Sequence, residues 1–212
     1  MIDKECNPLG LKFNNPGWEE EFMLNEIQTE YKPDAWGLTQ GDEVLEIGGH
    51  TGEDTMTLAK KYGCHVTVFE PSPPNYKKLI ANITLNRLEE KITTINKAVT
   101  KDGRLVRMNV MARNSGAHNI FGKKERGDPL VASVTLAQAI GLCKKIPTLL
   151  LIDCEAAEFE ILADLAPLRG IRMLRGEFHS RTPGDIEELL RRVKTLIPDA
   201  QPHMHHPKRG KA

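Results

Sequence analysis

Short apolar runs alternate with amphipathic segments along most of the chain. Apolar residues recur at near-helical spacing from Trp18 to Tyr31, which predicts an N-terminal amphipathic helix. Beyond it, apolar and β-branched runs bounded by turn residues predict strands at residues 43–47, 65–69, 92–99, 147–152 and 171–178. Helical patterns separate or follow these runs at residues 52–63, 74–86, 135–142, 157–165 and 184–196.

This alternation predicts an α/β fold with a mostly parallel central sheet and helices on both faces, because right-handed strand–helix–strand crossovers return to the same sheet. The run 147–152 is apolar throughout, as a central strand buried on both faces should be. Residues 104–121 are polar and irregular, with enough Val and Met at their start to predict a β-excursion. Ligands of such sheets bind beyond the carboxyl ends of the strands, where the strand order reverses.

The length of 212 residues suits one domain with a sizeable core. We expect an N-terminal helical segment, residues 1–33, to pack on a main domain, residues 34–197. The sequence after Leu196 is proline-rich, polar and basic, so residues 198–212 are expected to form a flexible tail.

Composition limits the partners of the chain. Lys plus Arg and Asp plus Glu both number 29, so the formal net charge is zero, which argues against nucleic-acid binding by bulk electrostatics. The cysteines Cys6, Cys64, Cys143 and Cys154 form no C-x-x-C pair, which is typical of reduced thiols. No stretch approaches the ~18 apolar residues of a membrane span. We expect a cytoplasmic protein with neither nucleic acid nor membrane as a partner.

The stretch VLEIGGHTGEDT, residues 44–55, places a carboxylate at a strand end and a glycine turn directly after it. The turn lacks the dinucleotide pattern G-x-G-x-x-G in both registers, and no Gly-Lys-Ser/Thr follows as in a P-loop. Glu46 would repel a pyrophosphate, whereas it could pair with a cation or accept hydrogen bonds from an ammonium. A fitting ligand has an amino group, a carboxylate for the next helix N-terminus, a positive sulfur and a nucleoside. S-adenosylmethionine (SAM) has all four.

A second carboxylate supports the same ligand. Glu70 ends HVTVFE, where an acid can accept hydrogen bonds from both ribose hydroxyls, and Pro71 fixes the loop after it. The alternative interpretation is that Glu46 and Glu70 are ordinary solvated carboxylates at strand ends.

Several segments, in this order, resemble the FkbM family of SAM-dependent methyltransferases. They are residues 44–100, VTLAQAI at 134–140, LLLIDCEAAEFEIL at 149–162 and RGEFHS at 175–180. The resemblance implies a Rossmann-like class I methyltransferase fold and methyl transfer from SAM, commonly to a hydroxyl oxygen of a sugar or natural product. Three positions depart from the family pattern: His50 replaces the usual Asn, Leu151 the frequent Lys, and Ala156 the usual Gly.

The glycine turn and the resemblance together predict where SAM binds. His50 would lie next to the methionine moiety, where a neutral imidazole could donate the hydrogen bond of an asparagine and a charged one would oppose the sulfonium. The predicted cofactor-binding residues are Glu46, Gly48, Gly49, His50, Thr51, Gly52, Glu70, Pro71, Ser72, Asn96, Ala98 and Asp153.

The resemblance also implies that acidic residues surround the methyl acceptor. They come from the two family segments IDxExxE and ExH. The predicted catalytic residues are Asp153, Glu155, Glu158, Glu177 and His179. Clustered carboxylates raise one another's pKa, which suits a general base for a hydroxyl proton, and His179 could be that base or a structural residue. Binding of a divalent cation and capping of the next helix stay as alternatives, and we predict no metal-binding residues.

The predicted function is therefore SAM-dependent O-methylation of a small-molecule acceptor. Two alternatives stay open. The altered IDCEAAE segment would suit a non-catalytic SAM or nucleoside binder, and an RNA methyltransferase would share the cofactor fold. The neutral net charge and the lack of an Asn/Asp-Pro-Pro-aromatic motif count against RNA.

The C-terminal residues lead to two further expectations. Class I methyltransferases normally finish with an antiparallel hairpin, for which the sequence after Leu196 is too short, so we expect a shortened or missing hairpin. The sheet edge would then be bare, covered by the tail or buried in a homodimer. The histidines His203, His205 and His206 lie in a proline-broken segment and are not expected to bind a metal.

Overall fold

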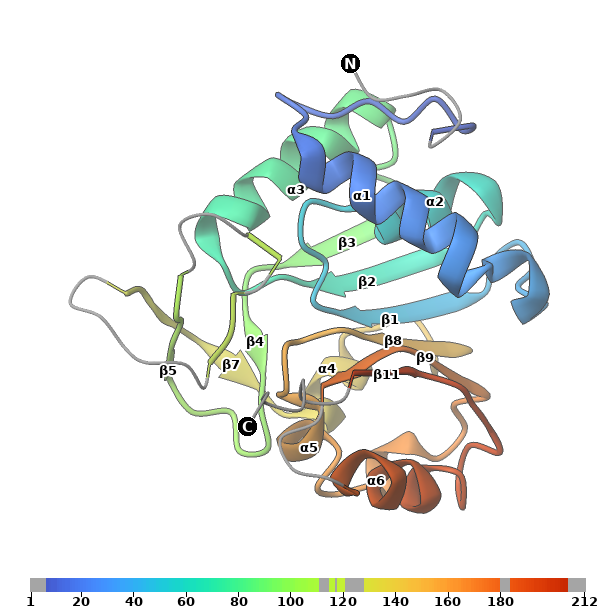
Figure 1. The fold of residues 1–212 in the computed structure, drawn as a ribbon, viewed down its shortest axis with the longest axis vertical. Helices are drawn as coiled ribbons and strands as arrows, with labels where there is room; N and C mark the ends of the chain where they lie inside the picture. Colours follow the sequence, from blue (N-terminus) through green and yellow to red (C-terminus); the bar gives the residue numbers. More distant parts are fainter. Residues whose placement is uncertain (1–6, 111–114, 117, 121–127, 180–183, 206–212) are drawn as a thin grey trace, which may run out of the picture.

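A computed structural model describes residues 7–110, 115–116, 118–120, 128–179 and 184–205. Its centre is a sheet with the strand order β10-β9-β8-β1-β2-β3, in which β11 also pairs with β9 (Figure 1). Every pairing in this sheet is parallel. The strands are β1 Glu43–Ile47, β2 His65–Phe69, β3 Ile92–Ile95, β8 Leu149–Ile152, β9 Met173–His179, β10 Asp199–Ala200 and β11 His203–His205.

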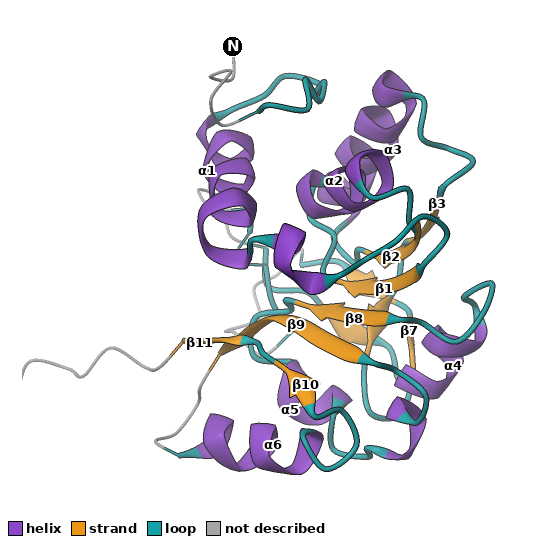
Figure 2. Ribbon diagram, turned by 90° about the vertical axis from the view of Figure 1, so that its right-hand side faces the viewer, coloured by secondary structure: helices purple, strands orange, loops and turns teal. Residues whose placement is uncertain are grey.

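Helices cover both faces of the sheet, with α1, α2 and α3 on one side and α4, α5 and α6 on the other (Figure 2). This arrangement confirms the predicted fold class. The helices are α1 Trp18–Glu26, α2 Glu53–Lys61, α3 Pro73–Asn86, α4 Leu136–Gly141, α5 Glu158–Ile161 and α6 Asp185–Val193. A π-helical turn, Ile27–Tyr31, extends α1, and short 3-10 helices occupy Pro33–Trp36 and Ala166–Leu168.

The sheet separates two hydrophobic cores because alternate side chains of a strand face opposite sides. Leu45 and Ile47 of β1 pack with α4, α5 and α6, whereas Val44 packs with α1, α2 and α3. All four residues of β8 are buried, as its apolar sequence predicted for a central strand.

The strand order reverses between β1 and β8. From β1 the chain continues to β2 and β3 on one side, while β8, β9 and β10 extend the other side. Gly48, directly after β1, has a φ of +98°, and a Cβ on it would lie 1.7 Å from the carbonyl oxygen of Asp153, directly after β8. Only glycine permits this approach. The two strand ends that open the ligand crevice of such sheets are therefore in direct contact.

Two predicted elements are shorter than expected. The strand predicted at 92–99 ends at Ile95, and the chain turns so that β4, Ala98–Val99, pairs with β7, Ser133–Val134, in a separate sheet. The helix predicted at 157–165 ends at Ile161, because Asp164 accepts the amide hydrogen of Ala166 and the chain turns into the following 3-10 helix.

The predicted β-excursion is present in the residues that the structure describes. The strands β5, Val106–Arg107, and β6, Leu130–Val131, form an antiparallel pair, and an isolated bridge joins Asn109 to Asn119. Residues 111–114, 117 and 121–127 of this region lie outside the described part of the chain.

The expectation of a flexible tail from residue 198 is wrong for residues 199–205. They form β10 and β11 along β9, and the guanidinium of Arg175 donates to the carbonyl oxygen of Asp199 at 2.5 Å and to its carboxylate at 3.0 Å. The edge of β9 is therefore covered by the chain itself, and the described residues after β9 form no antiparallel hairpin. A homodimer stays a prediction, and residues 206–212, with His206, lie outside the description. No helix in the described ranges has the length and apolarity that crossing a bilayer requires.

A substitution at Gly176 tests whether the close backbone approach of β8 and β9 is needed for stability. Its φ is +110°, and a Cβ would lie 2.1 Å from the carbonyl oxygen of Ile152. We expect Gly176→Ala to lower the free energy of unfolding in urea by about 3 kcal/mol or more, because the left-handed φ and the backbone clash add. The matched control is Gly141→Ala at the end of α4, where no atom lies within 4 Å; it should be neutral or stabilise by up to about 1 kcal/mol. Similar stability of the two variants would contradict this geometry.

Candidate functional site

A cavity lies at the carboxyl ends of β1, β2 and β8, between the strand ends and α1. Nine of the residues predicted from the sequence line it: Glu46, Gly48, Gly49, His50, Glu70, Pro71, Ala98, Asp153 and Glu155. Residues that the sequence analysis missed also line it, from α1 and the turn after it, from the start of α2 and from the β-excursion. They include Met23, Glu26, Tyr31, Glu53, Asp54, Met108, Ser115 and Ile120.

Some predicted cofactor residues lie behind the cavity wall. The Asn96 amide donates to the carbonyl oxygens of Glu70 at 2.8 Å and Pro71 at 3.2 Å, so it braces the loop after β2. Ser72 is buried at the N-cap position of α3, although its hydroxyl makes no capping hydrogen bond. The residues of the predicted set that do not line the cavity are Thr51, Gly52, Ser72 and Asn96.

Glu70 presents a buried carboxylate to the cavity. Its two oxygens accept the backbone amide hydrogens of His50 and Ser72, each at 2.8 Å. Burial raises the pKa of Glu70 to about 7, although these hydrogen bonds oppose the shift. Each oxygen keeps a lone pair, so a pair of neighbouring hydroxyls on a ligand could bind here.

The opposite end of the cavity is strongly acidic. Glu46 is buried, accepts a hydrogen bond from the Thr55 hydroxyl at 2.6 Å, and has its pKa raised by burial to about 8. Burial also raises the pKa of Asp54 well above its usual value and that of Glu26 to about 7. Ionised carboxylates gathered in a buried place favour a cationic ligand.

His50 does not stand free beside the methionine end. Its ring lies between Glu53, 3.4 Å from Nδ1, and Ser115, 2.7 Å from Nε2. Burial lowers the pKa of His50, but the carboxylates of Glu53, Glu70 and Glu19 outweigh it and raise the pKa overall. A protonated His50 would therefore be paired with Glu53, and the expectation that a charged imidazole opposes the sulfonium stays a prediction.

Ser115 also connects the β-excursion to α1. Its amide nitrogen and its hydroxyl both donate to the carboxylate of Glu19, at 2.9 and 2.5 Å. Helix α1, which contributes Met23 and Glu26 to the cavity lining, is thus hydrogen-bonded to the β-excursion.

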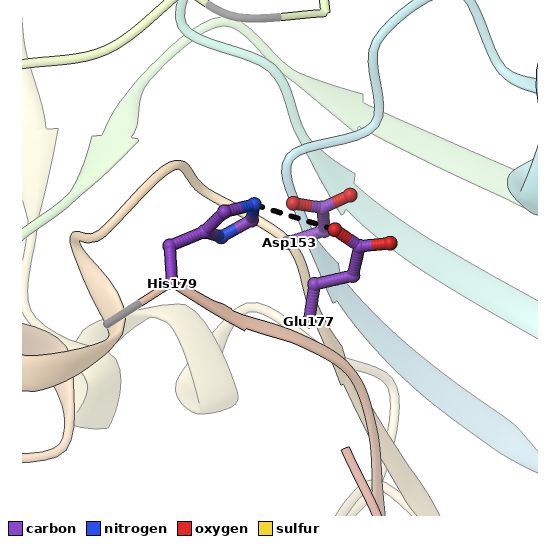
Figure 3. Close-up of side chains that lie close together, drawn as sticks. All are labelled: Asp153, Glu177 and His179. Carbon is purple, nitrogen blue, oxygen red and sulfur yellow. Dashed lines mark ion pairs between the residues drawn. The ribbon is translucent and has the colours of Figure 1, made fainter. Parts of the chain in front are cut away.

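Three of the predicted catalytic residues form a compact cluster next to the cavity (Figure 3). Their nitrogen and carboxylate oxygen atoms lie within 4.8 Å of one another in Asp153, Glu177 and His179. Nε2 of His179 is 3.3 Å from Glu177 and 3.8 Å from Glu155. Burial opposes protonation of His179, but hydrogen bonds to Glu158 and Glu177 outweigh it and raise its pKa to about 11. The imidazole is therefore a cation at neutral pH, not a free base.

Two members of the cluster, His179 and Glu177, have partners outside it. The carboxylate of Glu158, fully buried behind the cluster, is 3.3 Å from Nδ1 of His179. The Tyr31 hydroxyl donates to Glu177 at 3.1 Å, and the Tyr31 ring stacks at 5.1 Å on the ring of His203 in β11. Burial and the nearby Glu177 raise the pKa of Asp153 well above its usual value.

The segment between the cluster and α5 has a strained backbone. Glu155 and Ala156 both have positive φ, +53° and +72°. A glycine would adopt this conformation without cost, which explains why the family pattern has glycine at the second position.

The family profile described as the methyltransferase FkbM domain matches residues 46–200, most of the chain. The chain belongs to this family. The family is one of methyltransferases, for which the sequence resemblance implies SAM as the methyl donor. The resemblance seen in the sequence is thereby confirmed.

Individual relatives are distant. A Haemophilus influenzae protein described as uncharacterized is 38% identical over 56 residues, which are 26% of this chain and 22% of that protein. The C-terminal domain of precorrin-6Y C5,15-methyltransferase from Rhodobacter capsulatus is 10% identical with a TM-score of 0.39, covering 71% of this chain and 57% of that one. A Geobacter sulfurreducens SAM-dependent methyltransferase in complex with S-adenosyl-L-homocysteine is 20% identical with a TM-score of 0.29, covering 45% and 37%. The chain spans less than two thirds of each of these relatives.

The lining of the cavity fits SAM. Carboxylates at the β1 end suit its ammonium and sulfonium, and Glu70 suits its ribose hydroxyls. Beyond Glu70 the wall is mostly apolar, as a purine ring requires, with Phe69, Pro71, Ala98, Val99, Met108 and Ile120.

Glu46 predicts how SAM affinity depends on pH. Its pKa of about 8 means that near neutral pH the free protein holds a proton that a cationic ligand displaces. Affinity should therefore rise about ten- to thirtyfold from roughly pH 6 to 7.5, with proton release on binding, as measured by calorimetry in buffers of different ionisation enthalpy. Glu46→Gln should bind more weakly and with a flatter profile. A wild-type affinity that stays constant over this range would contradict the assignment.

Proposed function

We propose that this methyltransferase transfers the methyl group to a hydroxyl oxygen of a small-molecule acceptor, such as a sugar or a natural-product-like compound. The observation that carries the proposal is the cluster of Asp153, Glu177 and His179 next to the cavity. A hydroxyl must lose its proton as it attacks a methyl group, so it needs titratable groups of this kind nearby.

Residues at one end of the site would bind SAM, and residues at the other end would act on the acceptor. SAM supplies a methyl group on a positive sulfur, which is a very good leaving group. Glu70 would hold the ribose hydroxyls and Glu46 the ammonium group, an arrangement that would align the methyl group with the acceptor. Methyl transfer is an in-line displacement, so this alignment contributes much of the rate.

The acidic cluster would favour removal of the proton from the acceptor hydroxyl. His179 is already protonated and holds Glu177 and Glu158 in place. Asp153 lines the cavity and has a raised pKa, so its carboxylate is the member best placed to favour removal of the hydroxyl proton.

An acceptor screen with Asp153→Asn tests the proposal. Wild type incubated with SAM and a library of hydroxylated compounds should add one methyl group to a hydroxyl, detected by mass spectrometry and located by NMR. We expect Asp153→Asn to lower kcat on the acceptor found by about 10²–10⁴-fold, while SAM affinity changes much less. Glu89→Gln, an exposed acid that does not line the cavity, is the matched control.

The acidity of the acceptor provides a second readout. A fluorinated analogue of that acceptor, with a more acidic hydroxyl, should lose less activity in Asp153→Asn, because it needs less help to release its proton. Methylation only at nitrogen or carbon, or an unchanged kcat in Asp153→Asn, would refute O-methylation through this cluster. SAM binding without any acceptor in a broad library would favour the non-catalytic binder instead.

A further inference from the structure

The cluster has the donor atoms of a metal site. Asp153 directly follows β8, and Glu177 and His179 lie two residues apart in β9, so both point to the same face of that strand. Figure 3 shows the three side chains converging from the two strands. One ligand atom from each residue lies within 4.8 Å of the other two. We propose that Asp153, Glu177 and His179 bind one divalent cation of the Mn²⁺ type.

Outer partners orient two of these ligands. The carboxylate of Glu158 is 3.3 Å from Nδ1 of His179, which leaves Nε2 directed at the cluster. The Tyr31 hydroxyl donates to Oε1 of Glu177. The other oxygen of this carboxylate, Oε2, lies 3.3 Å from Nε2 of His179. A carboxylate behind a ligating histidine and a hydrogen bond on the far oxygen of a ligating carboxylate are regular features of metal sites.

Glu158 provides an independent observation. Its side chain has no exposed surface, and its Oε2 has no hydrogen-bond partner among the described residues. The same carboxylate group faces His179 through Oε1. A buried carboxylate with an oxygen that has no partner is costly, and a divalent cation on Nε2 of His179 would offset part of this cost through the imidazole that lies between the ion and Glu158.

The donor set limits which ions fit. Two carboxylates and one imidazole suit Mn²⁺, Fe²⁺ or Zn²⁺ better than Ca²⁺, which takes six to eight oxygen ligands. Mn²⁺ binds readily to mixed oxygen and nitrogen donors and is directly detectable, so it is the probe of choice.

The role of the cation rests on the proposed function. Since Asp153 lines the cavity, an ion on this cluster could bind the acceptor hydroxyl oxygen and lower its pKa, and the proton would leave to water. The bond between oxygen and the methyl carbon then forms as the bond between that carbon and sulfur breaks, with its electron pair staying on sulfur. Binding of the ion would displace the proton of His179 into water. The three side chains would then act as ligands, and the hydroxyl proton would be made acidic by the ion instead of being taken by Asp153.

Electron paramagnetic resonance of free Mn²⁺ tests binding directly. The full chain, treated with a chelator and then dialysed, is titrated with Mn²⁺ alone. We expect one ion per chain in wild type and at least about tenfold weaker binding in Glu177→Gln. Asp153→Asn is the second ligand variant, in case the first does not fold, and titration with S-adenosylhomocysteine checks that each variant retains its cofactor site.

Asp54→Asn is the matched control, because it removes one carboxylate from the same cavity but none from the cluster. Its Mn²⁺ affinity should stay within about threefold of wild type. No Mn²⁺ binding by wild type, or an equal loss in all three variants, would overturn the metal site. If S-adenosylhomocysteine binds but Mn²⁺ does not, only this inference fails; if Mn²⁺ binds but S-adenosylhomocysteine does not, the proposed function fails and the metal site stands.

Discussion

The close contact between the ends of β1 and β8 is the constraint on which the site depends. The missing side chain of Gly48 lets the backbone of Asp153 approach, and the amide of Asp153 donates to the carbonyl oxygen of Ile47. This contact places the acid of the first strand and the acid of the central strand at one opening. Strand order reverses at the same point. The crevice that parallel sheets use for ligands therefore lies between β1 and β2, which carry the proposed cofactor residues, and β8 and β9, which carry the proposed acceptor residues.

Electrostatics then determine which ligand this crevice accepts. Glu46, Asp54 and Glu26 crowd one end, and burial raises the pKa of each. A pyrophosphate would add negative charge to this end, whereas the ammonium and sulfonium of SAM neutralise it. The acceptor half follows the same principle, because the protonated imidazole of His179 holds several carboxylates together in the absence of any other cation on the cluster.

The sequence allowed the central strands and their terminal acids to be predicted because both signals are local. β1, β2 and β8 are apolar runs with turn residues at their ends, so Glu46, Glu70 and Asp153 could be placed at the carboxyl edge. β10 and β11 could not be predicted in this way. They are two and three residues long, too short for a periodic pattern, and their position depends on Arg175 and its distant partner Asp199.

The site residues that the sequence analysis missed depend on contacts between distant parts of the chain. Glu26 and Tyr31 reach the cavity only because α1 packs across the strand ends, which no local pattern reports. Ser115 comes from an irregular segment whose place over the site is fixed by its hydrogen bonds to Glu19. His50 was placed in the correct turn, but the direction of its ring depends on Ser115, 65 residues away in the chain.

The central claim is that one buried carboxylate after β2 holds the ribose of an amino-acid nucleoside. Calorimetric titration of S-adenosylhomocysteine into wild type and Glu70→Ala tests it most directly, with the exposed Glu89→Ala as control. We expect binding by wild type and by the control, and at least about tenfold weaker binding by Glu70→Ala, the loss that follows from removing two charge-assisted hydrogen bonds. No binding by wild type, or the same affinity in Glu70→Ala as in the control, would contradict it.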